Sequence, residues 1–375
     1  MQITVKPLVN NTDVIICHFA PSLTKVNRVG ISVGTKVNLK DFSKLLGLSP
    51  TTVSRALNGY PEVNIKTRER VEAAAREHGY APNPTAKQLA LGRAMAIGHI
   101  LPITNLDMVN PLFSDFLAGA GEVYSERGYD FHISITPEGK EAETYRSYAR
   151  HRKVDGVIVH APRNDDTRIP LLQEIGLPFL VHGRIDPQDA SYTWVDIDNR
   201  RAFDKATRYL TDLGHRRIAL LNGKETMNFA QRRRVGYEDA LKAAGIAVDP
   251  NLVFAGEMSE PLGHAAAVGM LAGENPPTAF LCSSFLIALG VQRAVTEAGK
   301  TLGHDVSVIT HDDGLSFLPN AGEIPMFTAT RSSIREAGHR CAEMLIDQIE
   351  GKCKTPAHEL WEAELVVGRS TGPAP

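Results

Sequence analysis

The chain has 375 residues, which predicts two or three domains, and its 43% hydrophobic and 22% charged residues are typical of a globular protein rather than a disordered one. The formal net charge of −2, taken over the whole chain, indicates no strong binder of polyanions. Four cysteines without a C-x-x-C pair exclude a disulfide framework and indicate a reduced, cytoplasmic location, and no run reaches the ~18 apolar residues that a membrane-spanning helix needs.

The small net charge hides an uneven distribution along the chain. Residues 37–96 carry nine basic and five acidic residues, a net +4, and residues 1–36 carry +3, so the remainder carries −9. A small basic module therefore precedes a large acidic one, which is a possible footprint of nucleic-acid binding. The alternative is that short segments often differ from the average by a few charges.

Residues 1–36 show neither a clean periodicity nor an export-signal pattern, because the apolar run Val14–Cys17 is too short for one. Recognisable structure begins only near Val37. We expect a tail here, and whether it is present in the native protein stays open.

Residues 37–82 predict three short helices. Asn38 is a helix N-cap, Gly47 ends the first helix, and Ser49 caps a second helix that has Pro50 at its first position. A third helix begins at Asn64. Apolar residues at helical spacing form the expected core: Phe42, Leu45 and Leu46, then Val53, Ala56 and Leu57, then Val71, Ala74 and Ala75. Two short helices joined by a glycine turn predict a helix-turn-helix headpiece.

Residues 83–95 predict a linker. Pro82 and Pro84 prevent a continuous helix, and the stretch 85–90 is too short to form a stable helix by itself in water. We expect this segment to fold only when something orders it.

From residue 96 to about 370, short apolar runs alternate with helical patterns. The strand candidates are 97–103, 130–135, 156–160, 179–182, 217–221, 253–255, 279–282 and 306–311. Helices are expected over 112–127, 199–213, 234–244, 286–298 and 333–349, among others. This alternation predicts parallel α/β architecture, and its length favours two lobes with a ligand cleft at the carboxyl ends of their strands.

The run N-L-K-D at 38–41 and the run L-S-P-T-T-V-S-R-A-L-N-G at 48–59 resemble the DNA-binding headpiece of the lactose/galactose repressor family. The similarity continues through 64–71, 79–83, 213–218 and 306–309, and it covers about residues 37–370. It implies a small all-α helix-turn-helix headpiece plus an α/β sensor of two lobes with parallel sheets, similar to periplasmic sugar-binding proteins. It also implies a cytoplasmic repressor, a homodimer or higher oligomer, that binds palindromic double-stranded operator DNA and responds to a small carbohydrate.

The resemblance also assigns the residues expected to contact DNA. The headpiece candidates are Pro50, Thr51, Thr52, Ser54, Arg55, Asn58 and Thr67. Thr51 can contact a thymine methyl group, and Arg55 can hold guanine or phosphate. Pro50 has an equally good explanation as a helix-capping residue, and Arg55 could be a solvated surface charge. In the linker, Ala86 and Leu89 match a hinge helix whose leucine is inserted between base pairs in the minor groove, which bends the DNA.

For the small-molecule site, the resemblance implies Asn110, Phe113, Arg184, Arg233, Ser284 and Asp312. Arg233 and Asp312 suit the hydroxyl groups of a neutral sugar. Ser284-Phe285 stands where many relatives have Asn-Asp, which predicts an apolar ring on one side of the ligand. Arg232 and Arg234 are expected to be surface charges. The stretches 180–184 and 194–199 are most similar to repressors of α-glucoside utilisation.

Enzyme interpretations are weaker. The G-x-S-x-G match at 30–34 lies in the unpatterned tail rather than between a strand and a helix. The sequence His311-Asp312-Asp313 suggests metal ligation, but neighbouring residues at a strand end are expected to point to opposite sides. We therefore expect no enzyme, cofactor or metal. A solute-binding protein for a sugar, without a DNA role, is the alternative.

Overall fold

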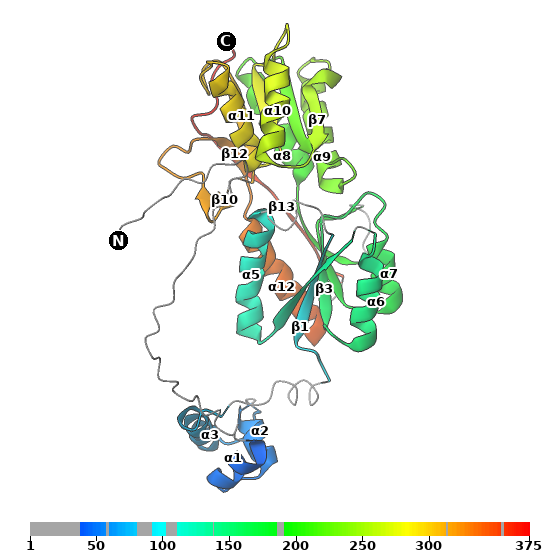
Figure 1. Ribbon diagram of the computed structural model, residues 1–375, viewed down its shortest axis with the longest axis vertical. Helices are drawn as coiled ribbons and strands as arrows, with labels where there is room; N and C mark the ends of the chain where they lie inside the picture. The colour runs from blue at the N-terminus through cyan, green and yellow to red at the C-terminus, as the bar shows by residue number, and fades with distance from the viewer. Residues whose placement is uncertain are drawn as a thin grey trace, which may run out of the picture. The chain divides into compact units, whose positions relative to one another are not determined.

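The computed structural model describes residues 38–57, 60–80, 92–102, 111–137, 139–185, 191–312, 314–353 and 356–375. The chain folds as two compact units, one ending at residue 84 and the other beginning at residue 85. Within the second unit, two six-stranded sheets form two lobes (Figure 1). This is the predicted combination of a small helical headpiece and a two-lobed α/β domain.

The first unit contains the three predicted helices, α1 (Leu39–Leu46), α2 (Pro50–Leu57) and α3 (Ile65–Glu77). Their caps are as expected: the side chains of Asn38, Ser49 and Asn64 accept hydrogen bonds from backbone N–H groups of the first turns at 2.9, 3.0 and 2.9 Å. Gly47 ends α1 with a left-handed φ of 63°, which glycine adopts without strain.

Phe42, Val53, Ala56 and Val71 are fully buried in the core of this unit. The prediction that Leu45 joins them is wrong, because its side chain is 59% exposed. The neighbouring helices cover the stripe of Phe42 and Leu46, one turn apart on α1, and this stripe does not extend to Leu45. A core contact that periodicity did not reveal is Tyr80, whose ring stacks on Phe42 at 4.2 Å between centroids.

The N-terminal lobe has a parallel sheet in the order β13-β5-β4-β3-β1-β2. Helices α5 and α12 cover one face and α6 and α7 the other (Figure 1). Its strands are β1 (Ala96–Pro102), β2 (Asp130–Thr136), β3 (Gly156–His160), β4 (Phe179–His182), β5 (Thr193–Ile197) and β13 (His358–Trp361). Its helices are α5 (Pro111–Arg127), α6 (Glu141–His151), α7 (Arg168–Ile175) and α12 (Ile334–Glu350).

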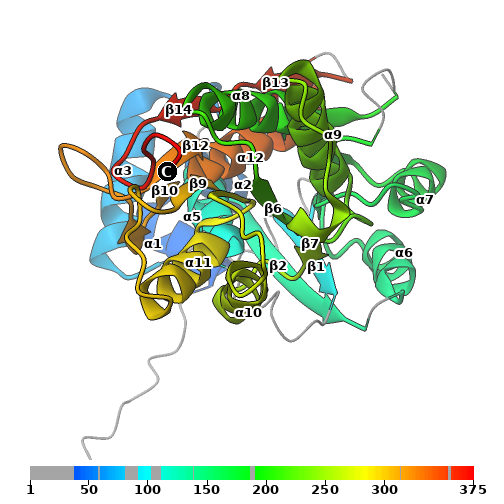
Figure 2. The ribbon, with the colours of Figure 1, turned by 90° about the horizontal axis from the view of Figure 1, so that it is seen from above.

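The C-terminal lobe repeats this plan with the order β14-β12-β9-β8-β6-β7, in which only the edge strand β14 pairs antiparallel. Helices α10 and α11 pack side by side over one face, as seen from above in Figure 2, and α8 and α9 cover the other. Its strands are β6 (Ile218–Gly223), β7 (Val253–Gly256), β8 (Ala279–Cys282), β9 (Ser307–His311), β12 (Thr328–Arg331) and β14 (Glu364–Val366). Its helices are α8 (Asn199–Asp212), α9 (Asn228–Ala243), α10 (Glu260–Leu271) and α11 (Phe285–Glu297), with a short 3₁₀ helix η2 (Pro250–Leu252). A hairpin of β10 (Gly314–Leu315) and β11 (Leu318–Pro319) follows β9.

In the described part of the chain, the two lobes are joined at three places, between β5 and α8, between β12 and α12, and between β13 and β14. Each lobe therefore contains segments from both early and late in the sequence. The strands β5, β12, β13 and β14 were not predicted. Among the helices whose bounds were predicted, the largest departure is α9, which begins at Asn228 rather than Arg234. Its first two turns contain three consecutive arginines, so an apolar periodicity could not reveal them.

Candidate functional sites

A cavity of about 240 Å³ lies between the two lobes. Its wall includes the last residues of three strands, His160 of β3, His182 of β4 and His311 of β9. In parallel α/β sheets, ligands bind at the carboxyl ends of the strands, so this is where a binding site is expected.

Arg233, in the wall of this cavity, is held on several sides. Its Nε donates to Asn199 Oδ1 at 2.7 Å and its Nη1 to the backbone oxygen of Ser283 at 2.8 Å, while the rings of Phe229 and Phe203 flank the guanidinium at 4.7 and 5.3 Å. Burial lowers the pKa of Arg233 to about 10, so it remains charged at neutral pH. The predicted pairing is present, with Nη2 at 3.7 Å from Asp312 Oδ2.

Asp312 adopts a left-handed backbone with φ of 51° immediately after β9. Its carboxylate contacts His311 Nε2 at 3.2 Å and accepts a hydrogen bond from the Ser332 hydroxyl. Burial alone would raise the pKa of Asp312, but His311, Arg233 and Ser332 lower it by more than burial raises it. The pKa therefore lies below its ordinary value, and the carboxylate is ionised. The expectation that His311 and Asp312 point apart is wrong, because the left-handed turn brings the two side chains together. The described residues nevertheless contain no group of three or more side chains that would hold a metal ion.

A second charged cluster joins the lobes beside the cavity. Asp196, near the end of β5, receives Arg232 Nη1 from α9 at 2.6 Å and Arg184 Nε at 3.0 Å. Arg232 also donates to the backbone oxygens of Arg184 and Ile185 at 3.0 and 2.7 Å. Arg232 is therefore not the expected surface charge, since its side chain is only 14% exposed and bridges the lobes.

Arg234, the other arginine expected at the surface, is 37% exposed and pairs with Glu225 and Glu238.

The N-terminal wall of the cavity is aromatic. Phe113 and Phe116 contact the His160 ring edge to face, with centroids 5.2 and 4.8 Å apart, and Phe116 lies 4.8 Å from the His182 ring. Phe113 thus lines the cavity as predicted. Both histidines were missed, although each ends a predicted strand, and that position is the sequence feature that could have identified them.

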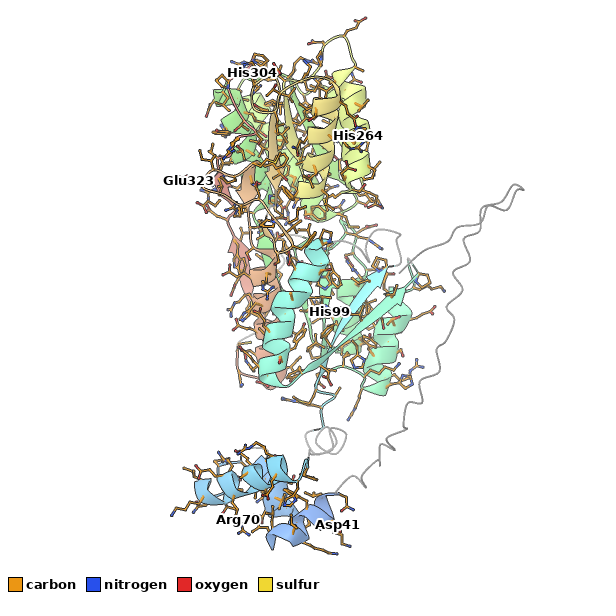
Figure 3. The ribbon with its side chains drawn as sticks, turned by 60° about the vertical axis from the view of Figure 1, so that its left-hand side comes forward. Asp41, Arg70, His99, His264, His304 and Glu323 are labelled. Atoms are coloured by element: carbon orange, nitrogen blue, oxygen red, sulfur yellow. The ribbon has the colours of Figure 1, made fainter. Side chains whose placement is uncertain are left out.

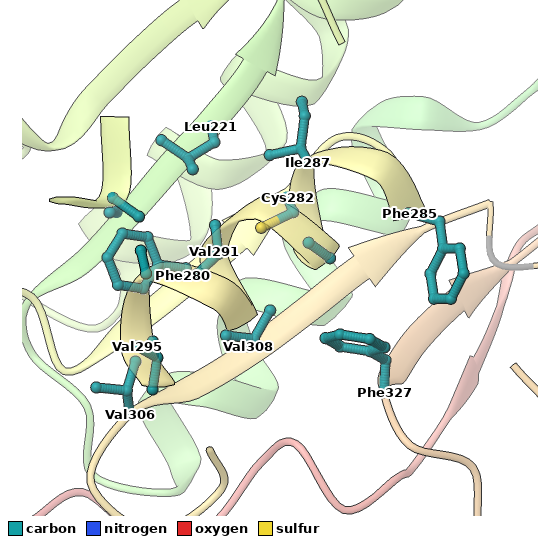
Figure 4. Close-up of a cluster of buried hydrophobic side chains, with 14 of the residues drawn as sticks. Leu221, Phe280, Cys282, Phe285, Ile287, Val291, Val295, Val306, Val308 and Phe327 are labelled. Carbon is teal, nitrogen blue, oxygen red and sulfur yellow. The ribbon is translucent and has the colours of Figure 1, made fainter. Parts of the chain in front are cut away.

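Of the remaining predicted residues, Ser284 does not line the cavity. Ser284 caps α11 by accepting from the Ile287 N–H at 3.3 Å, and it lies outside the cavity wall. The prediction that Phe285 faces a ligand is wrong: its ring packs against Phe327 in the core of the C-terminal lobe (Figure 4). Asn110 lies outside the described residues.

In the headpiece, the first turn of α2 presents Pro50 and Thr51 as exposed residues, and Arg55 is exposed one turn later. Thr52 and Ser54 are half-buried, and the Thr52 hydroxyl lies 2.8 Å from that of Ser49, so Thr52 contributes to the cap. On α3, Thr67 is half-buried. The predicted contacts Asn58, Ala86 and Leu89 lie outside the described residues.

Comparison with known proteins agrees with both halves of this architecture. Residues 38–83 match the family described as "Bacterial regulatory proteins, lacI family", and residues 207–371 match "Periplasmic binding protein-like domain". Among curated proteins, the chain is 47% identical to the HTH-type transcriptional regulator AglR of Rhizobium meliloti (strain 1021), over 90% of this chain and 95% of that protein. It is 32% identical to the HTH-type transcriptional regulator CelR of Thermobifida fusca, over 88% and 97% of the two chains.

Solved structures give the same result. A CelR–cellobiose complex is similar with a TM-score of 0.66 and 31% identity, covering 89% of this chain and 99% of that one. The lac repressor dimer bound to operator and the anti-inducer ONPF is similar with a TM-score of 0.75 and 26% identity, covering 90% and 100%. No helix in the described part of the chain is long and apolar enough to cross a membrane. The chain belongs to the lacI family of bacterial regulatory proteins and is a DNA-binding transcriptional regulator.

Proposed function

We propose that this protein is a cytoplasmic repressor of carbohydrate-utilisation genes, and that a neutral saccharide of the α-glucoside class releases it from a palindromic operator. The observation that carries the proposal is the paired charge of the cavity. Arg233 faces Asp312, and Arg184 and Arg232 share Asp196. Since these charges have partners inside the protein, the cavity favours a neutral ligand with many hydroxyl groups over an ion.

The cavity is large enough for a small organic ligand, because its 240 Å³ is many times the roughly 10–15 Å³ that a cavity needs to admit one water. A relative of this chain was solved with cellobiose, and the resemblance of residues 180–184 and 194–199 favours an α-linked sugar here.

We further propose that the repressor is a homodimer with β2 in its interface. Phe131, Ile133 and Ile135 are 42–44% exposed and lie on one face of this strand, which is an edge of its sheet. Three aligned apolar side chains on an open edge favour a partner, and a second copy of the chain matches the two-fold symmetry of a palindrome.

An electrophoretic mobility shift with the DNA upstream of the protein's own gene tests the proposal. We expect a sequence-selective complex that maltose, trehalose or sucrose weakens, with cellobiose as the β-linked comparison. Tighter binding in the presence of a saccharide would make it a co-repressor. No effect of any saccharide would contradict the proposed effector class, and no selective complex would contradict the repressor itself.

The linker can be tested in the same assay. We expect Leu89→Ala to weaken binding to the operator far more than binding to unrelated DNA, because an apolar wedge between base pairs acts only where the DNA bends. Competition with unrelated DNA measures both affinities. Equal losses on the two kinds of DNA would rule out a wedge.

A further inference from the structure

A chain of three polar side chains leads from the cavity wall into the core of the N-terminal lobe. His160 Nε2 lies 3.0 Å from His99 Nδ1, and His99 Nε2 lies 3.0 Å from the Tyr124 hydroxyl on α5. His99 is fully buried and Tyr124 is 1% exposed. Figure 3 labels His99 in the sheet of this lobe. The family resemblance assigned none of these residues to the site.

Both histidines are neutral. Burial lowers the pKa of His99 to about 3, and burial together with the neighbouring imidazoles and Arg168 lowers that of His160 well below its ordinary value. A neutral imidazole has one nitrogen that donates a hydrogen bond and one that accepts. Once the donor of one hydrogen bond in the Tyr124–His99–His160 series is known, the donor of the other hydrogen bond follows.

Tyr124 determines that direction. Within the described part of the protein, the only hydrogen-bond partner of its hydroxyl is His99 Nε2. If His99 donated instead, the hydroxyl proton would be buried without an acceptor, which is costly. Tyr124 therefore donates to Nε2, which leaves the proton of His99 on Nδ1. His99 in turn donates to His160 Nε2, so His160 carries its own proton on Nδ1.

We propose that the Tyr124–His99–His160 chain makes Nδ1 of His160 a fixed hydrogen-bond donor that recognises an oxygen of the bound saccharide. His160 lines the cavity, and its Nδ1 has no hydrogen-bond partner among the described residues. A ring or glycosidic oxygen can only accept a hydrogen bond, and a fixed donor suits such an oxygen. This inference rests on the proposed saccharide effector. His160 is then a specificity-determining residue, and His99 and Tyr124 are positioning residues.

The tautomers are measurable without any ligand, by ¹⁵N NMR of the histidine rings in the full-length protein. His160→Gln and His99→Gln assign the signals. We expect both rings to carry the proton on Nδ1, and a proton on Nε2 of His160 would overturn the proposal. Tyr124→Phe should change the His160 signals. Tyr148→Phe is the matched control, because Tyr148 is a buried tyrosine of the same lobe whose hydroxyl bonds Ser134 at 2.6 Å and lies outside this chain.

Titration calorimetry with maltose and trehalose gives a second readout. Tyr124→Phe should weaken saccharide binding about three- to tenfold, the usual effect of one hydrogen bond, while Tyr148→Phe changes it less than about twofold. His160→Leu should weaken it at least as much as Tyr124→Phe. His160→Asn, which keeps an N–H donor near the position of Nδ1, should retain more affinity than His160→Leu.

Equal affinities of the two tyrosine variants would overturn the proposal even where the wild-type protein binds saccharide. If the wild-type protein binds neither saccharide, the proposed effector fails. The NMR result then decides the tautomer of His160 independently.

Discussion

Asp196 is contacted by one arginine from each lobe, and this makes it the residue through which the lobes are joined beside the cavity. Arg232 comes from α9 of the C-terminal lobe, and Arg184 from the loop after β4 of the N-terminal lobe. Burial raises the pKa of Asp196 to about 6, although both arginines lower it. The carboxylate therefore depends on both partners to remain charged.

We expect Arg232→Leu to lower the free energy of unfolding by about 1–3 kcal/mol, because it removes one of the two arginines that pair with the buried Asp196 and takes the Arg232 donor from two backbone oxygens. Urea-induced unfolding followed by circular dichroism measures the change. Arg200→Leu is the control, since Arg200 is 60% exposed and pairs with the exposed Asp239, so its loss should cost less than about 1 kcal/mol. Similar losses in the two variants would show that Arg232 is an ordinary surface residue.

The buried histidines predict sensitivity to acid. Burial lowers the pKa of His182 to about 4, below the unfolded value of 6.5, so its contribution is complete above pH 6.5 and is lost as the pH falls toward 4. Replacing this side chain should remove about 3 kcal/mol of that pH dependence. The contribution of Asp196 to this pH dependence has the opposite sign. Its pKa is raised in the folded state, so the folded protein binds a proton at this carboxylate more readily than the unfolded chain does.

Unfolding of His182→Leu and the wild-type protein at pH 7, 6, 5 and 4 isolates the histidine contribution. The variant should lose less stability than the wild type between pH 6.5 and 4. Parallel curves would mean that His182 titrates normally in the folded protein.

The family motif was sufficient to predict that Arg233, Asp312, Arg184 and Phe113 lie together, and all four line the cavity, because each follows a recognisable strand or motif. It could not predict Arg232, whose partner Asp196 is 36 residues away and in the other lobe. The pairing of His311 with Asp312 was missed for a different reason. A left-handed residue at a strand end reverses the usual alternation, and the aspartate gives no indication of it in sequence.

At the level of elements, three helix pairs pack closely through glycines. A Cβ at Gly119 of α5 would collide with the backbone oxygen of Arg335, and one at Gly338 of α12 with that of Phe116. Glycines bring α8 to α9 and α10 to α11 in the same way. Helical periodicity predicted most of these helices, but close backbone approach depends on the partner helix and cannot be predicted from one sequence.

We expect Gly119→Ala to destabilise the protein by about 1–3 kcal/mol, because the added methyl group forces α5 away from α12. Gly121 on the same helix is the matched control, since a Cβ there meets nothing within 4 Å. Gly121→Ala should stabilise the protein by about 0.5–1 kcal/mol through helix propensity. Thermal unfolding of both variants measures the difference, and a shift of the same sign in both would contradict the close approach.

At the level of the whole molecule, the exposed face of β2 predicts how two copies meet. Ile133→Asp places a charge in the middle of the apolar stripe and should raise the dimer dissociation constant at least about a hundredfold, because a buried unpaired charge is strongly unfavourable. Analytical ultracentrifugation measures it.

Val235→Asp, at a 40% exposed position on α9, is the control and should leave the dimer intact. A monomer in both variants, or a dimer in both, would place the interface elsewhere.

The connection of the lobes also determines when the protein can fold during synthesis. Strand β13 and helix α12 belong to the N-terminal lobe but come from residues 334–361, and α12 supplies Cys341, Leu345 and Ile346 to its core. The ribosome must therefore synthesise nearly the whole chain before this lobe can complete its sheet and core. The described residues of the headpiece form one core between residues 39 and 80, so the headpiece is able to form much earlier. A DNA-reading surface thus exists on the nascent chain before the sensor that controls it.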